Sequence, residues 1–137
     1  MNIFVLDACA MIALLSEEEG CDVVEELIQQ AIYGNIKLKI NQINLLEVYY
    51  DLLKVRNQIY ANQIIEIVKE YPIDFIHGLS DNVFQEAGRL KANYKIPLGD
   101  AIAMAECIVQ NATLVTSDRK DIEKVEKAEN VKVNWFR

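Results

Sequence analysis

Short apolar runs alternate along the chain with longer stretches in which apolar residues return every three or four positions. A short apolar run favours a buried strand, whereas the three- and four-residue spacing is typical of an amphipathic helix. The predicted strands are residues 3–6, 37–40, 73–76, 113–116 and 131–135. The predicted helices are residues 21–33, 43–55, 59–71, 81–94, 100–110 and, as a short element, 121–125.

This order of elements predicts the fold class. Helices that intervene between strands favour an α/β fold with a mostly parallel central sheet of about four or five strands, flanked by helices. A chain of 137 residues is long enough for one ordinary domain and too short for two, so residues 1–137 are expected to form a single domain. We find no internal repeat, low-complexity segment or linker.

One acidic residue interrupts the apolar pattern near the start of the chain. In VLDACAMIALL, Asp7 follows the first predicted strand and precedes a second apolar stretch, residues 8–15. Burial of an unpaired carboxylate costs several kcal/mol or more, and no helix cap or nearby base is expected to account for this one. Asp7 must therefore lie at an opening, be paired, or bind a cation.

Three further acids occupy related positions. Asp118 follows the predicted strand 113–116, and open α/β sheets bind ligands beyond the C-terminal ends of their strands. If these two strands are neighbours, Asp7 and Asp118 converge. Asp100 lies in the first turn of an alanine-rich helix that can approach the sheet closely, and Glu47 lies on the helix 43–55.

Each of the three also has a structural interpretation that stays open. Asp118 fits a helix N-cap, with Asp121 as the acid three residues later. Asp100 fits a residue that stabilises the positive end of its helix. Glu47 belongs to a polar stripe at helical spacing that is typical of a solvated face; its other members are Asn44, Asp51 and Lys54.

The net charge of −7 comes from one end of the chain. Residues 1–36 contain seven acids, five of them between Glu18 and Glu26, and no Lys or Arg, while the remaining residues carry 14 acids and 14 bases. The global charge therefore says little about what the rest of the protein binds. The acids at 17–26 fit either a solvated helix start or a docking surface for a basic partner.

Composition excludes several other classes. The apolar run near the N-terminus is well short of the roughly 20 residues that span a bilayer, and no secretion signal is readable, so we expect a cytoplasmic protein without a membrane segment. Cys9, Cys21 and Cys107 are odd in number with no CxxC pair, and His77 is the single histidine. A disulfide framework and a Cys/His zinc site are therefore not expected.

Four segments together resemble a known family. VLDACAMIALL, INLLEVYYDLL, LGDAIAMA and ATLVTSDRKDI, in this order and spacing, resemble the PIN domain, in particular the VapC-type toxins of bacterial and archaeal toxin–antitoxin pairs. The resemblance covers essentially the whole chain. It implies that the catalytic, metal-binding acids are Asp7, Glu47, Asp100 and Asp118. It further implies a supporting hydroxyl at Thr116 or Ser117 and an accessory acid at Asp121.

The residue types agree with that chemistry. Carboxylates without His or Cys suit Mg²⁺ or Mn²⁺ better than Zn²⁺, and such ions activate water for attack on a phosphodiester. The expected function is a metal-dependent endoribonuclease, the toxin of a type II toxin–antitoxin pair. The resemblance also implies a homodimer and a small antitoxin partner. Arg119 and Lys120, beside Asp118, fit either phosphate contacts or ordinary surface charges.

One position departs from the family pattern, and two other functions stay in view. Members of the family commonly carry Ser or Thr two residues after the first Asp, where this chain has Cys9, a poor hydrogen-bond donor. A PIN-fold or other α/β binding or scaffold module without catalytic activity is the alternative. Dehalogenase-type phosphotransfer would need a second Asp at position 9.

Overall fold

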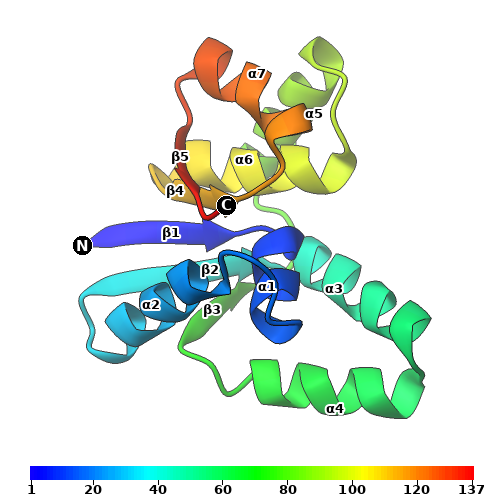
Figure 1. Cartoon of the computed structure of the whole chain (residues 1–137). Helices are drawn as coiled ribbons and strands as arrows, with labels where there is room; N and C mark the ends of the chain where they lie inside the picture. Colours follow the sequence, from blue (N-terminus) through cyan, green and yellow to red (C-terminus); the bar gives the residue numbers. More distant parts are fainter.

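The computed structural model describes all residues, 1–137, and contains one five-stranded parallel sheet (Figure 1). The strand order is β3-β2-β1-β4-β5, so β1 lies at the centre with β4 directly beside it. The strands are β1 (Asn2–Leu6), β2 (Ile36–Asn41), β3 (Ile73–Ile76), β4 (Thr113–Thr116) and β5 (Lys132–Trp135).

Seven helices cover both faces of this sheet (Figure 1). They are α1 (Ala8–Leu15), α2 (Cys21–Ile32), α3 (Gln42–Val55), α4 (Gln58–Val68), α5 (Asp81–Asn93), α6 (Leu98–Gln110) and α7 (Arg119–Glu129). None of them is long and apolar enough to cross a membrane.

Two hydrophobic cores lie on opposite faces of the sheet. Successive strand residues point to opposite faces, so Val5 and Leu6 belong to different cores although both are fully buried. Val5 packs with α5, α6 and α7, whereas Leu6 packs with α1, α2, α3 and α4. Burial on both faces explains the continuous apolar runs of the central strands.

The fold class predicted from the sequence is confirmed, with two local differences. Helix α1, over Ala8–Leu15, was not predicted, because a stretch that is apolar on every side shows no helical period. Helix α7 spans Arg119–Glu129 and is longer than predicted, because only Ile122 and Val125 of this charged segment are buried, so few apolar positions mark where the helix begins and ends.

Candidate functional site

The four predicted acids line one cavity at the carboxyl ends of the central strands. Asp7, Glu47, Asp100 and Asp118 border a cavity of about 280 Å³. Strands β1 and β4 are neighbours, and the Asp7 amide donates to the Val115 carbonyl at 3.4 Å. The two strand-end acids are therefore adjacent because their strands pair, while α3 and α6 supply the other two.

Asp7 is only 3% exposed and also caps a helix. Its Oδ1 accepts hydrogen bonds from the Ala10 amide at 2.9 Å and the Cys9 thiol at 3.0 Å. The expectation that no helix cap accounts for Asp7 is therefore wrong, since α1 begins directly after it. A carboxylate has enough lone pairs to cap a helix and still face the cavity. Burial raises the pKa of Asp7, against the lowering effect of these hydrogen bonds.

Asp100 is crowded by other carboxylates. It lies in the first turn of α6, and one oxygen each from Asp100, Asp118 and Asp121 lie within 4.8 Å of one another. Burial, the hydrogen bond with Asp118 and the nearby negative charges raise the pKa of Asp100 to about 9. Its Oδ2 is buried without a hydrogen-bond partner. No base relieves this crowding, as expected of a cation site rather than a salt-bridge network.

Asp118 both caps a helix and lines the cavity, so its structural and functional interpretations are compatible. Asp118 is the N-cap of α7, and its Oδ1 accepts from the Asp121 amide at 3.4 Å. Its own amide donates to Thr116 Oγ1 at 3.1 Å, and Thr116 is fully buried. Thr116 therefore fixes the backbone that carries Asp118. Ser117, the other predicted hydroxyl, lies beside Cys9.

Asn44, a member of the same polar stripe, holds Glu47 in place, and Gly99, which no sequence pattern singles out, leaves room for its carboxylate. Asn44, 1% exposed, donates to Glu47 Oε1 at 3.3 Å and to the Gly99 carbonyl at 3.0 Å. A Cβ at Gly99 would overlap the Glu47 carboxylate. Burial raises the pKa of Glu47, and the negative charge of Asp7 adds to this. The solvated-face interpretation of this stripe is wrong at Asn44, which is buried, while Asp51 is half-buried and lines the cavity.

Cys9 occupies the centre of the hydrogen-bonded network behind the acids. Its sulfur lies 3.0 and 3.2 Å from the two oxygens of Asp7 and 3.5 Å from Thr116 Oγ1. It also accepts from the Ser117 amide at 3.4 Å. Burial, and next the charge of Asp7, raise the pKa of the Cys9 thiol to about 12. Cys9 is therefore a neutral thiol that donates to Asp7, as a weak substitute for a hydroxyl.

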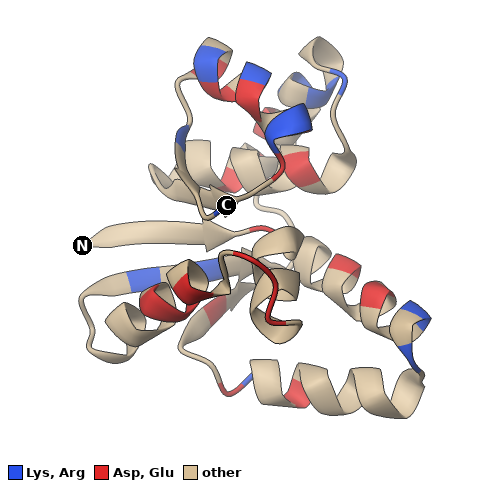
Figure 2. Ribbon diagram, in the orientation of Figure 1, with Lys and Arg blue, Asp and Glu red and all other residues tan.

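The two predicted basic residues do not line the cavity. The Arg119 guanidinium lies 4.5 Å from the centroid of the Trp135 ring and donates to the Arg137 carbonyl at 3.3 Å. Lys120 is exposed at the start of α7. Figure 2 places acidic residues prominently on α2 and on the loop before it. Neither base neutralises the acids of the cavity.

The donor set fits a hard divalent cation. The polar side chains that line the cavity are five carboxylates, the neutral thiol of Cys9 and the phenol of Tyr50, with no His, Lys or Arg among them. Oxygen ligands of this kind suit Mg²⁺ or Mn²⁺. The partnerless Oδ2 of Asp100 is an unused ligand atom within this group. The residues that are present therefore fit the metal that the sequence predicted.

Several solved structures of bacterial proteins share this fold. VapBC2 from Rickettsia felis, bound to a promoter DNA fragment, matches with a TM-score of 0.76 and 20% identity over 96% of this chain and 97% of that chain. DNA-bound VapBC from Salmonella typhimurium matches with a TM-score of 0.78 and 13% identity over 100% of both chains. FitAcB from Neisseria gonorrhoeae matches with a TM-score of 0.68 and 15% identity over 95% of each.

Sequence comparison assigns the family. No curated protein matches the chain by sequence. The family model of the PIN domain matches residues 4–128, a range that contains all four predicted acids and all seven helices except the last residue of α7. The chain belongs to the PIN domain family.

Proposed function

We propose that this protein is a divalent-metal-dependent endoribonuclease that hydrolyses RNA phosphodiesters. One observation carries the proposal. Four carboxylates from separate segments of the chain border one cavity, and the buried Oδ2 of Asp100 has no hydrogen-bond partner there. The PIN domain family, to which the chain belongs, consists of nucleases, which supports the same chemistry.

The proposal assigns separate roles to the acids of the site and to the residues that orient them. Asp7, Glu47, Asp100 and Asp118 hold Mg²⁺ or Mn²⁺, with Asp121 as an accessory acid. When bound, the metal lowers the pKa of a water nucleophile and neutralises charge on the phosphodiester. The chain itself orients these ligands: Thr116 accepts from the amide of Asp118, and Asn44 donates to Glu47.

The test is cleavage of a structured RNA with and without metal. Activity should require Mg²⁺ or Mn²⁺, stop with EDTA and return when Mn²⁺ is added. Asp100→Asn should abolish it, because the amide supplies a neutral ligand. Asp81→Asn is the matched control, since Asp81 is also a first-turn acid but lies exposed on α5. Undiminished cleavage by Asp100→Asn would remove Asp100 from the site, and RNA binding without cleavage would favour a scaffold.

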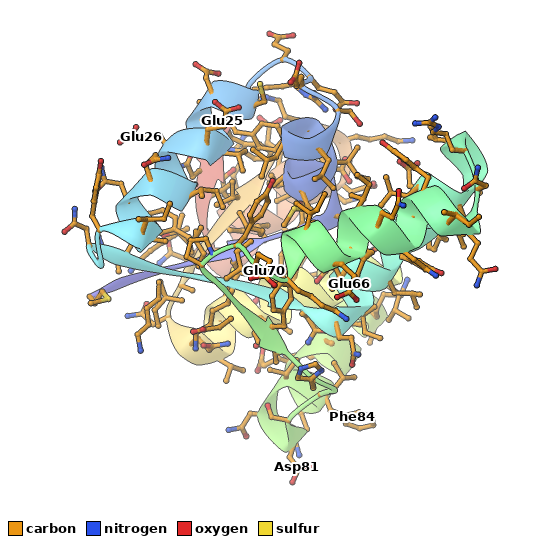
Figure 3. The ribbon with its side chains drawn as sticks, turned by 90° about the horizontal axis from the view of Figure 1, so that it is seen from below. Glu25, Glu26, Glu66, Glu70, Asp81 and Phe84 are labelled. Carbon is orange, nitrogen blue, oxygen red and sulfur yellow. The ribbon has the colours of Figure 1, made fainter.

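The proposal includes an antitoxin partner, and a structural neighbour from Klebsiella pneumoniae that is named as a toxin–antitoxin complex supports it. A groove of about 590 Å³ lies between α1, α2 and α4. Leu14, Ile28 and Ile64 contribute apolar surface to it, and Glu25 and Glu26 contribute charge. Figure 3 labels Glu25 and Glu26 on α2, Glu66 on α4 and Glu70 in the turn that follows α4. An apolar groove with acids at its border suits a basic amphipathic segment.

Two further points belong to the same proposal. Glu18 forms an ion pair with Arg137 at 3.1 Å, so the charge available to a partner lies with the acids that line the groove. The protein pairs as a homodimer, as the family resemblance implies. Light scattering of the purified protein tests this, and a monomeric mass at micromolar concentration would contradict it.

A further inference from the structure

One exposed aromatic ring borders the acidic cavity. Tyr50 lines the cavity from α3, one helical turn after Glu47, and is 46% exposed. Its hydroxyl makes no hydrogen bond within the protein, whereas the neighbouring Tyr49 donates to Asn62 at 2.7 Å and packs against the core. Tyr50 is the only aromatic residue that lines the cavity. The exposed ring is thus not explained by packing.

A lysine lies over this ring. Lys54 is one further turn along α3, and its Nζ lies 5.4 Å from the centroid of the Tyr50 ring. No carboxylate lies within 4.0 Å of this ammonium group, although acids are abundant nearby. No Lys or Arg lines the cavity itself. Lys54 lies over the ring of Tyr50, which does line it, and is free to meet an anionic ligand there.

The geometry points to a nucleotide subsite: the Tyr50 ring stacks on one unpaired base next to the scissile phosphate, and Lys54 contacts a phosphate of the same strand. This rests on the proposed ribonuclease function and adds how the substrate is held. Carboxylates repel a polyanion, so binding needs groups other than the metal ligands. Stacking does not depend on charge and tolerates any base, because every base has a π-face.

The subsite also requires that the base it holds be unpaired. A base can stack on a side chain only when it is splayed out of a helix, as in single strands, loops and bulges. The protein should therefore cleave unpaired RNA and leave the same sequence intact in a duplex. A protein face that uses Tyr50 to contact a second copy of the chain is the competing explanation, and the experiment separates the two.

The experiment measures steady-state cleavage of an RNA that the wild-type protein cuts. Tyr50→Ala should raise KM about five- to a hundredfold with little change in kcat, whereas Tyr50→Phe keeps the ring and should stay close to wild type. Tyr33→Ala is the control, because Tyr33 is 69% exposed at the end of α2 and does not line the cavity. An unchanged KM for Tyr50→Ala would overturn the subsite.

A set of RNAs with one abasic residue gives the sharper test. In wild type, one abasic position beside the cleaved bond should raise KM as much as Tyr50→Ala does. In Tyr50→Ala the same abasic position should have no further effect, since the base has lost its partner. Equal penalties in both proteins at every position would overturn the stacking. A Tyr50→Ala protein that becomes monomeric while its KM stays at the wild-type value would show an interface instead.

Lys54 is tested by the dependence of KM on salt. Lys54→Gln should make the plot of log KM against log salt shallower by about 0.7, the value for one contact to a single-strand phosphate. Arg56→Gln is the matched control, because Arg56 lies 4.5 Å from the Tyr60 ring in a similar pair that does not line the cavity. Equal slopes in all three proteins would overturn the Lys54 contact. Absence of any cleavage by wild type would instead refute the ribonuclease proposal.

Discussion

Replacement of Asp100 by Asn should make the metal-free protein more stable. In the metal-free fold, burial and the charges of Asp118, Asp7 and Asp121 raise the pKa of Asp100 to about 9 from 3.8. The amide of Asn has nearly the same shape, can donate to Asp118 and carries no charge. The substitution therefore removes the repulsion and leaves the packing of α6 in place.

The magnitude follows from the pKa of Asp100. At pH 7 the carboxyl group of Asp100 is ionised in the unfolded chain and protonated in the fold. The cost of binding this proton is set by the distance from pH 7 to the ordinary pKa of 3.8, which is about three pH units. At about 1.4 kcal/mol for each unit, the upper limit of the cost is about 4 kcal/mol. Solvent reaches the cavity and screens part of the repulsion, so we expect a gain of about 1–3 kcal/mol.

The sign of the pH dependence identifies the cause. A carboxyl group whose pKa is raised in the fold binds a proton that the unfolded chain releases, between about pH 4 and about pH 9. The stability of wild type in EDTA should therefore fall as pH rises through this window. Asp100→Asn lacks that contribution, so its advantage in melting temperature should be small at pH 5 and reach several degrees at pH 8.

Thermal unfolding in EDTA and in Mn²⁺ measures both effects. A cation that binds only the folded protein adds about 2.7 kcal/mol at a hundredfold excess over Kd, so wild type should melt higher with Mn²⁺, and Asp100→Asn should show a smaller rise. Asp81→Asn, at an exposed helix start, should lose a few tenths of a kcal/mol and respond to neither variable. A less stable metal-free Asp100→Asn with a full Mn²⁺ response would refute the reasoning.

Three other predictions concern Cys9, Gly99 and the acids of the α1–α2–α4 groove. Cys9→Ser should preserve cleavage, because a hydroxyl donates to Asp7 better than a thiol does. Cys9→Ala removes this donor and should lower kcat, while the circular dichroism spectrum of the folded protein should stay unchanged. Gly99→Ala should weaken Mn²⁺ binding in calorimetry, because the added Cβ displaces Glu47; unchanged affinity would contradict this. Glu25→Lys with Glu26→Lys should weaken the binding of a basic amphipathic peptide most strongly at low salt; equal affinities would indicate a solvated surface.

The fold was predictable because most elements carry their own periodic signal. Strands 73–76 and 113–116 have the predicted bounds, and both interrupt the apolar spacing of the helices around them. Helix α1 was missed because its residues, ACAMIALL, are apolar on all sides, and a buried helix cannot be distinguished from a strand by period alone. The capping role of Asp7 was missed for the same reason.

The convergence of the acids depended on a topological rule more than on local patterns. The positions of Asp7 and Asp118 at strand ends are readable in the sequence, but their proximity requires β1 and β4 to be neighbours, which only the strand order reveals. Gly99 shows the limit of such reading. Its lack of a side chain matters because Glu47 of another helix occupies that space, and no spacing within LGDAIAMA encodes a contact with α3.

The polar stripe of α3 shows why amphipathic patterns leave function open. Asn44, Glu47, Asp51 and Lys54 recur at helical spacing, which establishes only that this face avoids the apolar core. A polar cavity meets that condition as well as water does. Along the stripe, Asn44 is buried, Glu47 and Asp51 border the cavity, and Lys54 is exposed. The face thus runs from the anchored acids out to solvent past Tyr50, and an RNA strand that leaves the metal along it would meet the aromatic ring before the lysine.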